Sequence, residues 1–395
     1  MIRALHHKLS RFYFFYYFFV GAFTPYWGLY LQSEKFSVAD IGILMSLFQI
    51  SRIFAPNFWG WLADHTGKRA PWIRLTAALG LLGFIAVFWA HGFIWFFLVM
   101  AALSLFTSST LPLAESLTFA HLANTRGHYS RIRMWGSLGF IVAVVVLGFL
   151  IDAFGIKSLL WFVLVAQIVL FGLTFTLPEP KVAPHEEDHF SVWQIIKQPT
   201  VMALLLGCGL MVTAHGVLYN FYSIYLSEYG YSKGTIGLLW AVGVVCEIIM
   251  FAYMPKLMAR FTLKQILLTS LVLAVLRFSV IGLAPDHLWI IILAQTLHAA
   301  TFGSFHAAAL EVITRFFNGR HQAKGQAIYN SIAYGVGGTL GGLAGGYALQ
   351  YLGGQKTFML AALFPLLGFV VIALGLKLTQ SKLTQDSVES PGIFR

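Results

Sequence analysis

The sequence predicts an all-α membrane protein, with twelve transmembrane helices in two repeats of six and both termini in the cytoplasm. Hydrophobic residues make up 58% of the 395 residues. Charged residues make up only 10%, where a soluble domain carries about 25%. Apolar runs of about 20 residues, the length of a bilayer-spanning helix, recur along the whole chain. They lack the alternation of apolar and polar residues that marks the strands of a membrane barrel.

The predicted spans follow one another with short polar loops between them. The first follows the basic segment MIRALHHKLSR and has no small-residue cleavage site, so we interpret it as a span and not as a removable signal peptide. Cys208 and Cys246 both fall inside spans, so no disulfide framework is expected. The twelve ranges are 12–32, 39–62, 72–90, 93–121, 131–152, 157–177, 200–226, 235–254, 264–283, 287–314, 323–350 and 356–377.

The net charge of +11 follows the predicted topology. Outside the spans, Lys and Arg fall on the predicted inner side, apart from four lysines on the outer side: Lys35, Lys157, Lys233 and Lys356. This is the positive-inside pattern of a multi-pass protein, and it predicts the bacterial inner membrane with the lipid bilayer as surroundings. A nucleic-acid partner is not expected, because the basic residues are spread over every inner loop instead of being clustered.

The chain divides into two similar halves. The longest polar stretch, LPEPKVAPHEEDHFSVWQIIKQP, follows the sixth span and is interpreted as a linker. We predict halves at 1–177 and 200–377, a cytoplasmic linker at 178–199 and a flexible cytoplasmic tail at 378–395. A constant offset of 195 relates Gly21 to Gly216, Tyr30 to Tyr225, Ser37 to Ser232 and Gly42 to Gly237. Parallel six-helix repeats are the plan of the major facilitator transporters, whose substrate site lies between the halves.

The stretch GWLADHTGKR at 60–69 resembles the loop signature of that superfamily. Its glycines suit a tight turn and close helix approach, and its aspartate suits the cap or pairing of a neighbouring helix end. We therefore predict a gating or topology element and not a substrate ligand. Its residues are Gly60, Asp64, Gly67, Lys68 and Arg69.

Charged residues inside the spans are few, and such residues are functional hypotheses by default. They are Arg52, Glu115, Glu247 and Arg277, with His215, His298 and His306 as further titratable groups. The offset of 195 places Arg52 at the position of Glu247. We expect Arg52 to pair with Glu115, and Glu247 to lie with Arg277 and His298. The alternative is that these charges only neutralise one another as part of the packing.

Proton coupling is predicted at Glu247, Arg277 and His298. A carboxylate beside an arginine in low dielectric binds a proton more readily when the arginine moves away. Glu247 is therefore the preferred proton carrier. Glu311 lies four residues before Arg315, the spacing of a helix-surface ion pair, and is interpreted as structural or gating.

Substrate contacts are predicted for a mixed polar and aromatic set. An aromatic-lined cavity suits a ring-bearing substrate, although packing is the alternative for Tyr26 and Tyr222. The set is Arg52, Glu115, Tyr26, Tyr222, Asn220, Phe302 and His306.

Metal binding is not expected, because His298 and His306 are eight residues apart, and a helical metal pair is usually spaced by four. The glycines at 337–346 lack the strand and lysine of a nucleotide loop and are interpreted as helix packing. We therefore expect no cofactor, with a proton gradient as energy source. The chain shows no nucleophile–base constellation of an enzyme.

Five stretches together resemble the 3-phenylpropionate permease branch of the superfamily, which is related to lactose permease and the nucleoside–proton symporters. They are LPLAESL (111–117), RIRMWGSLGF (131–140), GVVCEIIMF (243–251), VLRFSVIG (275–282) and QTLHAATFGSFHAA (295–308). By this resemblance Glu247, Arg277 and His298 occupy proton-coupling positions. No second acidic residue follows His298 by one turn, so the coupling network differs from that of lactose permease.

The resemblance implies a monomeric transporter that carries a small molecule by alternating access. It favours proton symport of an aromatic carboxylate such as 3-phenylpropionate. The residues are also compatible with a nucleoside or sugar symporter, or with a proton-driven exporter of the same fold.

Overall fold

The computed structural model describes residues 2–122, 127–179, 192–318 and 321–377, and all regular secondary structure within these ranges is helical. The predicted all-α class is therefore confirmed. Most of the predicted linker and the whole predicted tail lie outside the described residues.

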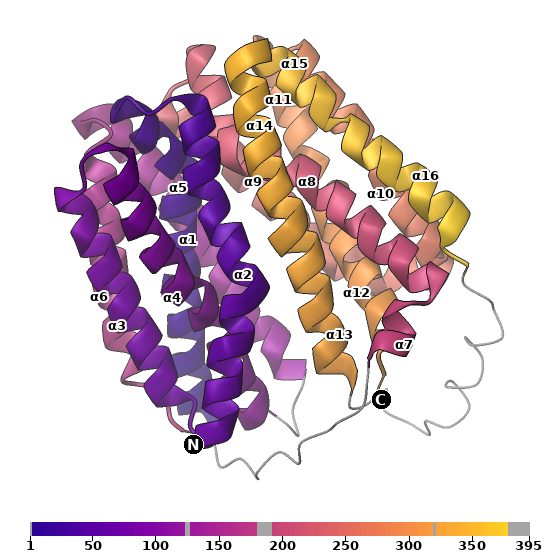
Figure 1. The fold of residues 1–395 in the computed structure, drawn as a ribbon, viewed down its shortest axis with the longest axis horizontal. Helices are drawn as coiled ribbons and strands as arrows, with labels where there is room; N and C mark the ends of the chain where they lie inside the picture. The colour runs from indigo at the N-terminus through magenta and orange to yellow at the C-terminus, as the bar shows by residue number, and fades with distance from the viewer. Residues whose placement is uncertain (1, 123–126, 180–191, 319–320, 378–395) are drawn as a thin grey trace.

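The helices follow the predicted order of spans (Figure 1). The first group is α1 (Ile2–Ser33), α2 (Val38–Thr66), α3 (Ala70–Ala86), η1 (Val87–Trp89), α4 (Gly92–His121), α5 (Gly127–Phe154) and α6 (Ser158–Thr174). The second group is α7 (Trp193–Ile196), α8 (Pro199–Glu228), α9 (Lys233–Arg260), α10 (Leu263–Leu283), α11 (Leu288–Thr296), η2 (Ala299–Ser304), α12 (Phe305–Phe316), α13 (Gln322–Tyr329), η4 (Asn330–Gly337), α14 (Gly338–Leu352), α15 (Gly354–Ala361) and α16 (Leu363–Gly375).

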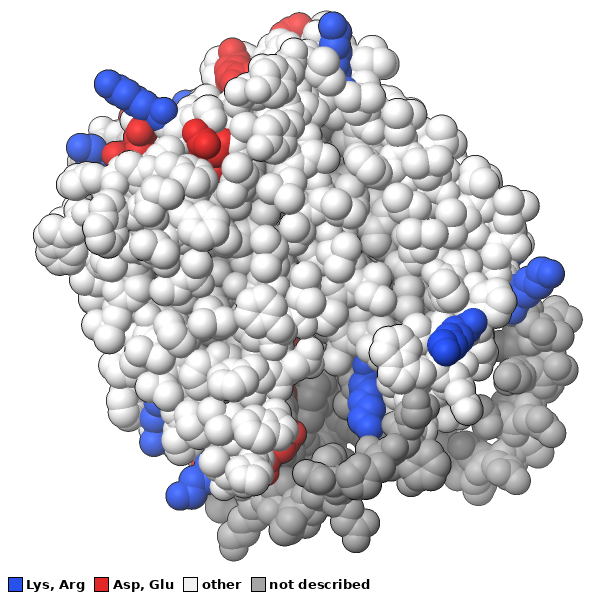
Figure 2. All heavy atoms as spheres, viewed as in Figure 1, with Lys and Arg blue, Asp and Glu red and all other residues white. Residues whose placement is uncertain are grey.

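Within the described ranges, nine helices are long and apolar enough to cross a membrane. They are α2, α3 with η1, α4, α5, α8, α9, α10, the segment from α11 to α12, and α15 with α16. The helix α6 is a shorter apolar helix. In Figure 2 the charged side chains gather at two opposite ends of the molecule, and the band between them is almost free of them, as a bilayer requires.

Several helices are longer than their predicted spans. The first was expected to begin at residue 12, but α1 begins at Ile2; α2 continues to Thr66 and α9 to Arg260. A helix satisfies its own backbone hydrogen bonds and can continue beyond the hydrocarbon core. Hydropathy detects only the part inside the core.

The offset of 195 corresponds to repeated structure. Ser37 is the N-cap residue of α2 and Ser232 is the N-cap residue of α9. Each serine side chain accepts a hydrogen bond from a backbone N–H in the first turn of its helix. The two caps have nearly the same backbone angles, with φ −65° and ψ 156° at Ser37 and φ −64° and ψ 154° at Ser232. Such caps fix where a helix begins.

Helices α1 to α6 lie together on one side of the molecule, and α8 to α16 lie on the other (Figure 1). The two groups meet where α5 packs against α9, α2 against α14, and α1 against α8. Glycines make the closest of these contacts possible: a Cβ on Gly42 would overlap the backbone of α14 at Gly342 and Gly346. The predicted packing role of the glycines at 337–346 is thus confirmed.

A carboxylate joins the two groups at the end of the molecule remote from the start of α1. Asp152, near the end of α5, accepts hydrogen bonds from the backbone N–H of Lys233 (2.9 Å) and of Gly234 (2.7 Å) at the start of α9. The Tyr26 hydroxyl donates to the carbonyl of Val144 (2.7 Å) and lies 3.1 Å from the carbonyl of Lys233. These contacts close the predicted outer side of the interface between α5 and α9.

Replacing Asp152 with Asn should destabilise the protein by about 0.5–2 kcal/mol, because the change removes the negative charge and one acceptor from a helix N-terminus. Thermal unfolding of the detergent-solubilised protein measures the effect. The matched control is Asp286→Asn, an exposed aspartate in the loop before α11. We expect that control to stay within about 0.5 kcal/mol of the wild type. Equal shifts in both variants would contradict a closing role for Asp152.

Candidate functional site

Arg277 is the centre of a buried polar network in the second group of helices. Its side chain, on α10, is 0% exposed. It donates from Nε to the carbonyl of Ala294 (3.0 Å) and from Nη2 to Oε1 of Gln295 (2.8 Å). From Nη1 it donates to Nδ1 of His298 and to Oγ1 of Thr301, both at 3.0 Å. The guanidinium is therefore held by four neutral acceptors.

His298 connects this arginine to Glu247. A guanidinium has only donors, so Nδ1 of His298 must accept from Arg277, and the ring proton must sit on Nε2. Nε2 lies 3.5 Å from Oε2 of Glu247. That separation is longer than a well-formed hydrogen bond, so the contact is a loose one. The predicted cluster of Glu247, Arg277 and His298 is present, with the histidine between the other two.

Glu247 lies in the middle of α9, and its side chain is 18% exposed. It packs beside Gly303 of η2, where an added Cβ would lie 3.5 Å from the Glu247 side chain, at van der Waals contact. Arg133 of α5 and His306 of α12 both lie near enough to interact electrostatically with its carboxyl group. Glu247 therefore lies within electrostatic range of a basic residue of the first group of helices as well as of two histidines of its own group.

The predicted pairing of Arg52 with Glu115 was wrong. Glu115 accepts a hydrogen bond from the Tyr129 hydroxyl (2.9 Å), whereas Arg52 is exposed and donates to Gln49 on its own helix (3.3 Å). The cause is the rotation of α2. Ser51 faces α4, with its Oγ 2.8 Å from Oγ of Ser104. Arg52 follows Ser51 directly, so its side chain points about 100° away from the direction of Ser51 and α4.

Arg133 is a site residue that the sequence reasoning missed. Its guanidinium lies over the ring of Tyr17 at 3.9 Å from the centroid, a cation–π contact. Its charge interacts with both carboxylates of the region, Glu115 and Glu247. The residue stands in RIRMWGSLGF, a stretch already noted for its resemblance. Because Arg133 is only the third residue of the predicted span at 131–152, it was interpreted as one of the basic residues of the inner loop.

Two π-helical turns shape the second group of helices here: η2 and η4. π-helical turns inside longer helices are often found at functional sites. Around η2 three aromatic rings stack on one another. The ring centroid of Phe302 lies 5.2 Å from that of His298 and 5.7 Å from that of His306, with interplanar angles of 10° and 11°. In a regular helix the first and last ring would be about 80° apart. The wider turn keeps all three rings in line.

Three other predicted contact residues are buried in the packing. Tyr26 is 0% exposed and joins α1, α5 and α9 through its hydroxyl. Tyr222 is fully buried edge-on against Trp240, with ring centroids 5.6 Å apart. Asn220 is buried on α8. The structure therefore does not place these residues on a surface that a substrate reaches in this conformation, whereas Phe302 and His306 are partly exposed.

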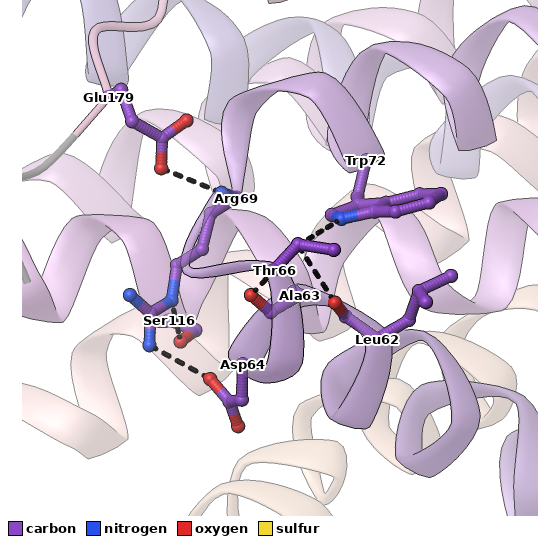
Figure 3. Close-up of polar contacts among 8 residues, drawn as sticks. All are labelled: Leu62, Ala63, Asp64, Thr66, Arg69, Trp72, Ser116 and Glu179. Carbon is purple, nitrogen blue, oxygen red and sulfur yellow. Dashed lines mark hydrogen bonds and ion pairs between the residues drawn. The ribbon is translucent and has the colours of Figure 1, made fainter. Parts of the chain in front are cut away.

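The loop signature forms a compact set of contacts around Arg69 (Figure 3). Arg69 pairs with Asp64 (3.1 Å) and donates from Nε to Ser116 (2.8 Å). Glu179, after α6, accepts from the backbone N–H of Arg69 (2.6 Å) and of Ala70 (2.8 Å), at the start of α3. The signature thus ties α2, α3, α4 and the chain after α6 together.

The two glycines of the signature differ in their roles. Gly67 ends α2 with φ +63°, a left-handed conformation that favours glycine, as expected for a tight turn. Gly60 was expected to allow close helix approach, but a Cβ added there would meet nothing within 4 Å. Its predicted packing role was wrong, because α2 presents that position to open space. Lys68 is exposed beside the turn.

Comparison with known proteins gives a single family. The family model described as "MFS_1 like family" matches residues 6–360. The chain belongs to this family of the major facilitator superfamily. It is a transporter and not an enzyme, and a multi-pass protein of the bacterial inner membrane. The resemblance to this superfamily inferred from the sequence is confirmed.

Relatives of this transporter have different named substrates. It is 30% identical over 346 residues to the probable 3-phenylpropionic acid transporter of Escherichia coli (strain K12), covering 86% of this chain and 90% of that one. It is 28% identical over 367 residues to the maltose permease of Geobacillus stearothermophilus, covering 92% of each. The crystal structure of the D323A mutant of the nucleoside transporter NupG superposes with a TM-score of 0.85 at 18% identity, covering 94% of this chain and all of that one.

Proposed function

We propose that this transporter is a proton symporter that imports an aromatic monocarboxylate such as 3-phenylpropionate by alternating access. In this proposal all twelve helical segments cross the membrane, both termini are cytoplasmic, and the monomer works alone. The halves 1–177 and 200–377, joined by the linker at 178–199, rock about a site between them.

The charge balance of the interior is the observation that carries the substrate class. The charged groups that interact around this region are three arginines, Arg52, Arg133 and Arg277, and two glutamates, Glu115 and Glu247. With neutral histidines and ionised glutamates the excess is one positive charge, and any further uncompensated charge in the bilayer interior is costly. A monoanion that enters together with one proton leaves this balance unchanged, whereas a neutral sugar or nucleoside that enters with a proton raises the excess to two.

The carboxylate of the substrate is proposed to pair with Arg133 and Arg52. Arg277 is less suited to this role, because it is fully buried and already donates to four acceptors. Arg52 is exposed and donates only to Gln49 among the described residues. Arg133 has Tyr17 and the nearby carboxylates as neighbours. A guanidinium offers a carboxylate two parallel hydrogen bonds.

The coupling step follows from the position of Glu247. While ionised, it attracts Arg133 and receives the Nε2–H of His298. When it takes up a proton from the outside, this attraction is lost and Arg133 becomes available to the anionic substrate. Substrate and proton then cross together, and loss of the proton on the inner side restores the attraction and expels the anion.

The proposal is tested by adding 3-phenylpropionate to a weakly buffered suspension of de-energised cells that produce the protein. Symport removes protons from the medium, so the medium should become alkaline. Cells without the protein control for diffusion of the free acid. The neutral analogue 3-phenylpropan-1-ol should give no signal. A signal no larger than that of the control cells would reject proton symport of this substrate.

A neutral substrate is the second candidate, favoured by the names of the maltose and nucleoside relatives. Alkalinisation with maltose or a nucleoside, and none with 3-phenylpropionate, would establish it. A proton-driven exporter of the same fold would instead accumulate solute inside energised inverted vesicles and release protons to their outside, whereas a proton symporter would not accumulate solute there.

A further inference from the structure

We propose that His306 is a specificity-determining residue of the transport site. Its Nε2–H donates a hydrogen bond to an acceptor on the ring of the substrate, and Tyr334 and Tyr329 hold the imidazole in the tautomer that can do so. The inference rests on the proposed transport of aromatic carboxylates, and it names a feature of the substrate that this function leaves open.

Three polar groups meet on one side of the His306 ring. Nδ1 of His306 lies 3.0 Å from the hydroxyl of Tyr329 and 3.0 Å from the hydroxyl of Tyr334. Tyr329 is only 1% exposed, so its hydroxyl proton needs an acceptor within the protein. Nδ1 of His306 is the hydrogen-bond partner of that hydroxyl among the described residues.

The buried hydroxyl of Tyr329 decides which ring nitrogen accepts. It donates to Nδ1 of His306, 3.0 Å away. If Nδ1 instead carried the ring proton, the hydroxyl proton of Tyr329 would have no acceptor there. A neutral imidazole has one donor and one acceptor nitrogen, so a proton-accepting Nδ1 places the ring proton on Nε2.

The Nε2–H is free on the other side of the ring. No hydrogen-bond partner of this nitrogen occurs in the part of the chain that the structure describes, and the ring is partly exposed. Glu247 and Arg133, both assigned to the proposed substrate site, lie close enough to interact electrostatically with His306. Phe302 stacks on it and is also partly exposed. A donor thus stands beside an apolar ring face, next to the charged groups proposed to take the carboxylate.

Such an arrangement discriminates among substrates. A substrate ring that carries a hydrogen-bond acceptor pairs with the Nε2–H of His306. A ring without an acceptor removes this N–H from water and leaves it without a partner. A phenylpropionate with an oxygen substituent on the ring should therefore be preferred over the unsubstituted acid.

The test uses exchange of radiolabelled compounds by the full-length protein in proteoliposomes. The probes are 3-phenylpropionate, 3-(4-hydroxyphenyl)propionate and 3-(4-methoxyphenyl)propionate, the last of which has an acceptor but no donor. In the wild type we expect kcat/KM for both oxygenated acids to exceed that for 3-phenylpropionate by about three- to tenfold, the effect of one hydrogen bond.

His306→Phe keeps an aromatic ring but has no donor, so kcat/KM for the two oxygenated acids should fall to the value for 3-phenylpropionate, whatever the absolute rate of exchange. His306→Gln can still donate and should retain part of the preference. Replacing both Tyr329 and Tyr334 with Phe removes the hydroxyls that fix the tautomer and should reduce the preference mainly through KM. The matched control is Tyr347→Phe, since Tyr347 is an exposed tyrosine on α14. It should leave the preference unchanged.

A wild type that exchanges all three acids equally overturns this inference alone, as does a preference that persists in His306→Phe. A wild type that exchanges none of them overturns the proposed substrate class and this inference together. If His306→Phe does not fold, His306→Gln and the variant with both Tyr329 and Tyr334 replaced by Phe are compared with Tyr347→Phe. Equal preferences in all three would contradict the inference.

Discussion

Replacing Glu247 with Gln should abolish uphill accumulation of substrate and leave exchange intact. The amide has nearly the shape of a protonated carboxyl group but can neither release nor bind a proton. The Nε2–H of His298 would still find an oxygen at this position. The variant should behave as if permanently protonated, so substrate crosses in both directions without using the proton gradient.

Two measurements check this result in proteoliposomes. With an imposed pH gradient, the ratio of internal to external substrate should fall to equality in Glu247→Gln, whereas counterflow of labelled substrate should persist. The control is Glu311→Gln. Glu311 lies on α12 and pairs with Arg315 at 2.8 Å in a half-exposed ion pair. Such pairs contribute roughly 0–1 kcal/mol, so this variant should accumulate substrate normally. Full accumulation by Glu247→Gln would rule out Glu247 as the proton carrier.

The depth of these residues in the membrane could be predicted from the sequence, but their rotation about the helix axis could not. The apolar runs placed Glu247, Arg277 and His298 inside spans of the second half. The prediction that these three residues lie together was correct. Arg52 of α2 was predicted to pair with Glu115 of α4 because both lie in the first half of the chain. In a span that is apolar on nearly every side, no polar face indicates which way a residue points. The Ser51–Ser104 contact, which turns Arg52 away, is visible only in three dimensions.

Arg133 was missed for a related reason. Hydropathy starts the fifth span at residue 131, but α5 begins at Gly127. Arg133 is therefore about 9 Å into the helix and not in the loop. The π-helical turns η2 and η4 were also outside the reach of the sequence, because they break the period on which helical reasoning depends. The column of His298, Phe302 and His306 depends on one of them.

Replacing Arg277 with Lys should impair both transport and stability, although the charge is conserved. The guanidinium donates in four directions from three nitrogens. A lysine has a single nitrogen with three donors, so it cannot reproduce this planar fork. At least one buried acceptor would be left unpaired, at a cost of about 1–3 kcal/mol. If Nδ1 of His298 loses its donor, its tautomer is no longer fixed and its contact with Glu247 becomes variable.

In Arg277→Lys the unfolding temperature and the rate of proton-coupled uptake should therefore both fall. If the tautomer of His298 matters for coupling, uptake should fall at least about tenfold. Arg315→Lys is the matched control, because that arginine is 41% exposed and its pair with Glu311 depends mainly on charge. We expect it to unfold within about 0.5 kcal/mol of the wild type. Normal uptake by Arg277→Lys with reduced stability would limit Arg277 to a packing role. Normal uptake with unchanged stability would mean that the network needs only a positive charge at this position, and that the donor geometry described here is not required.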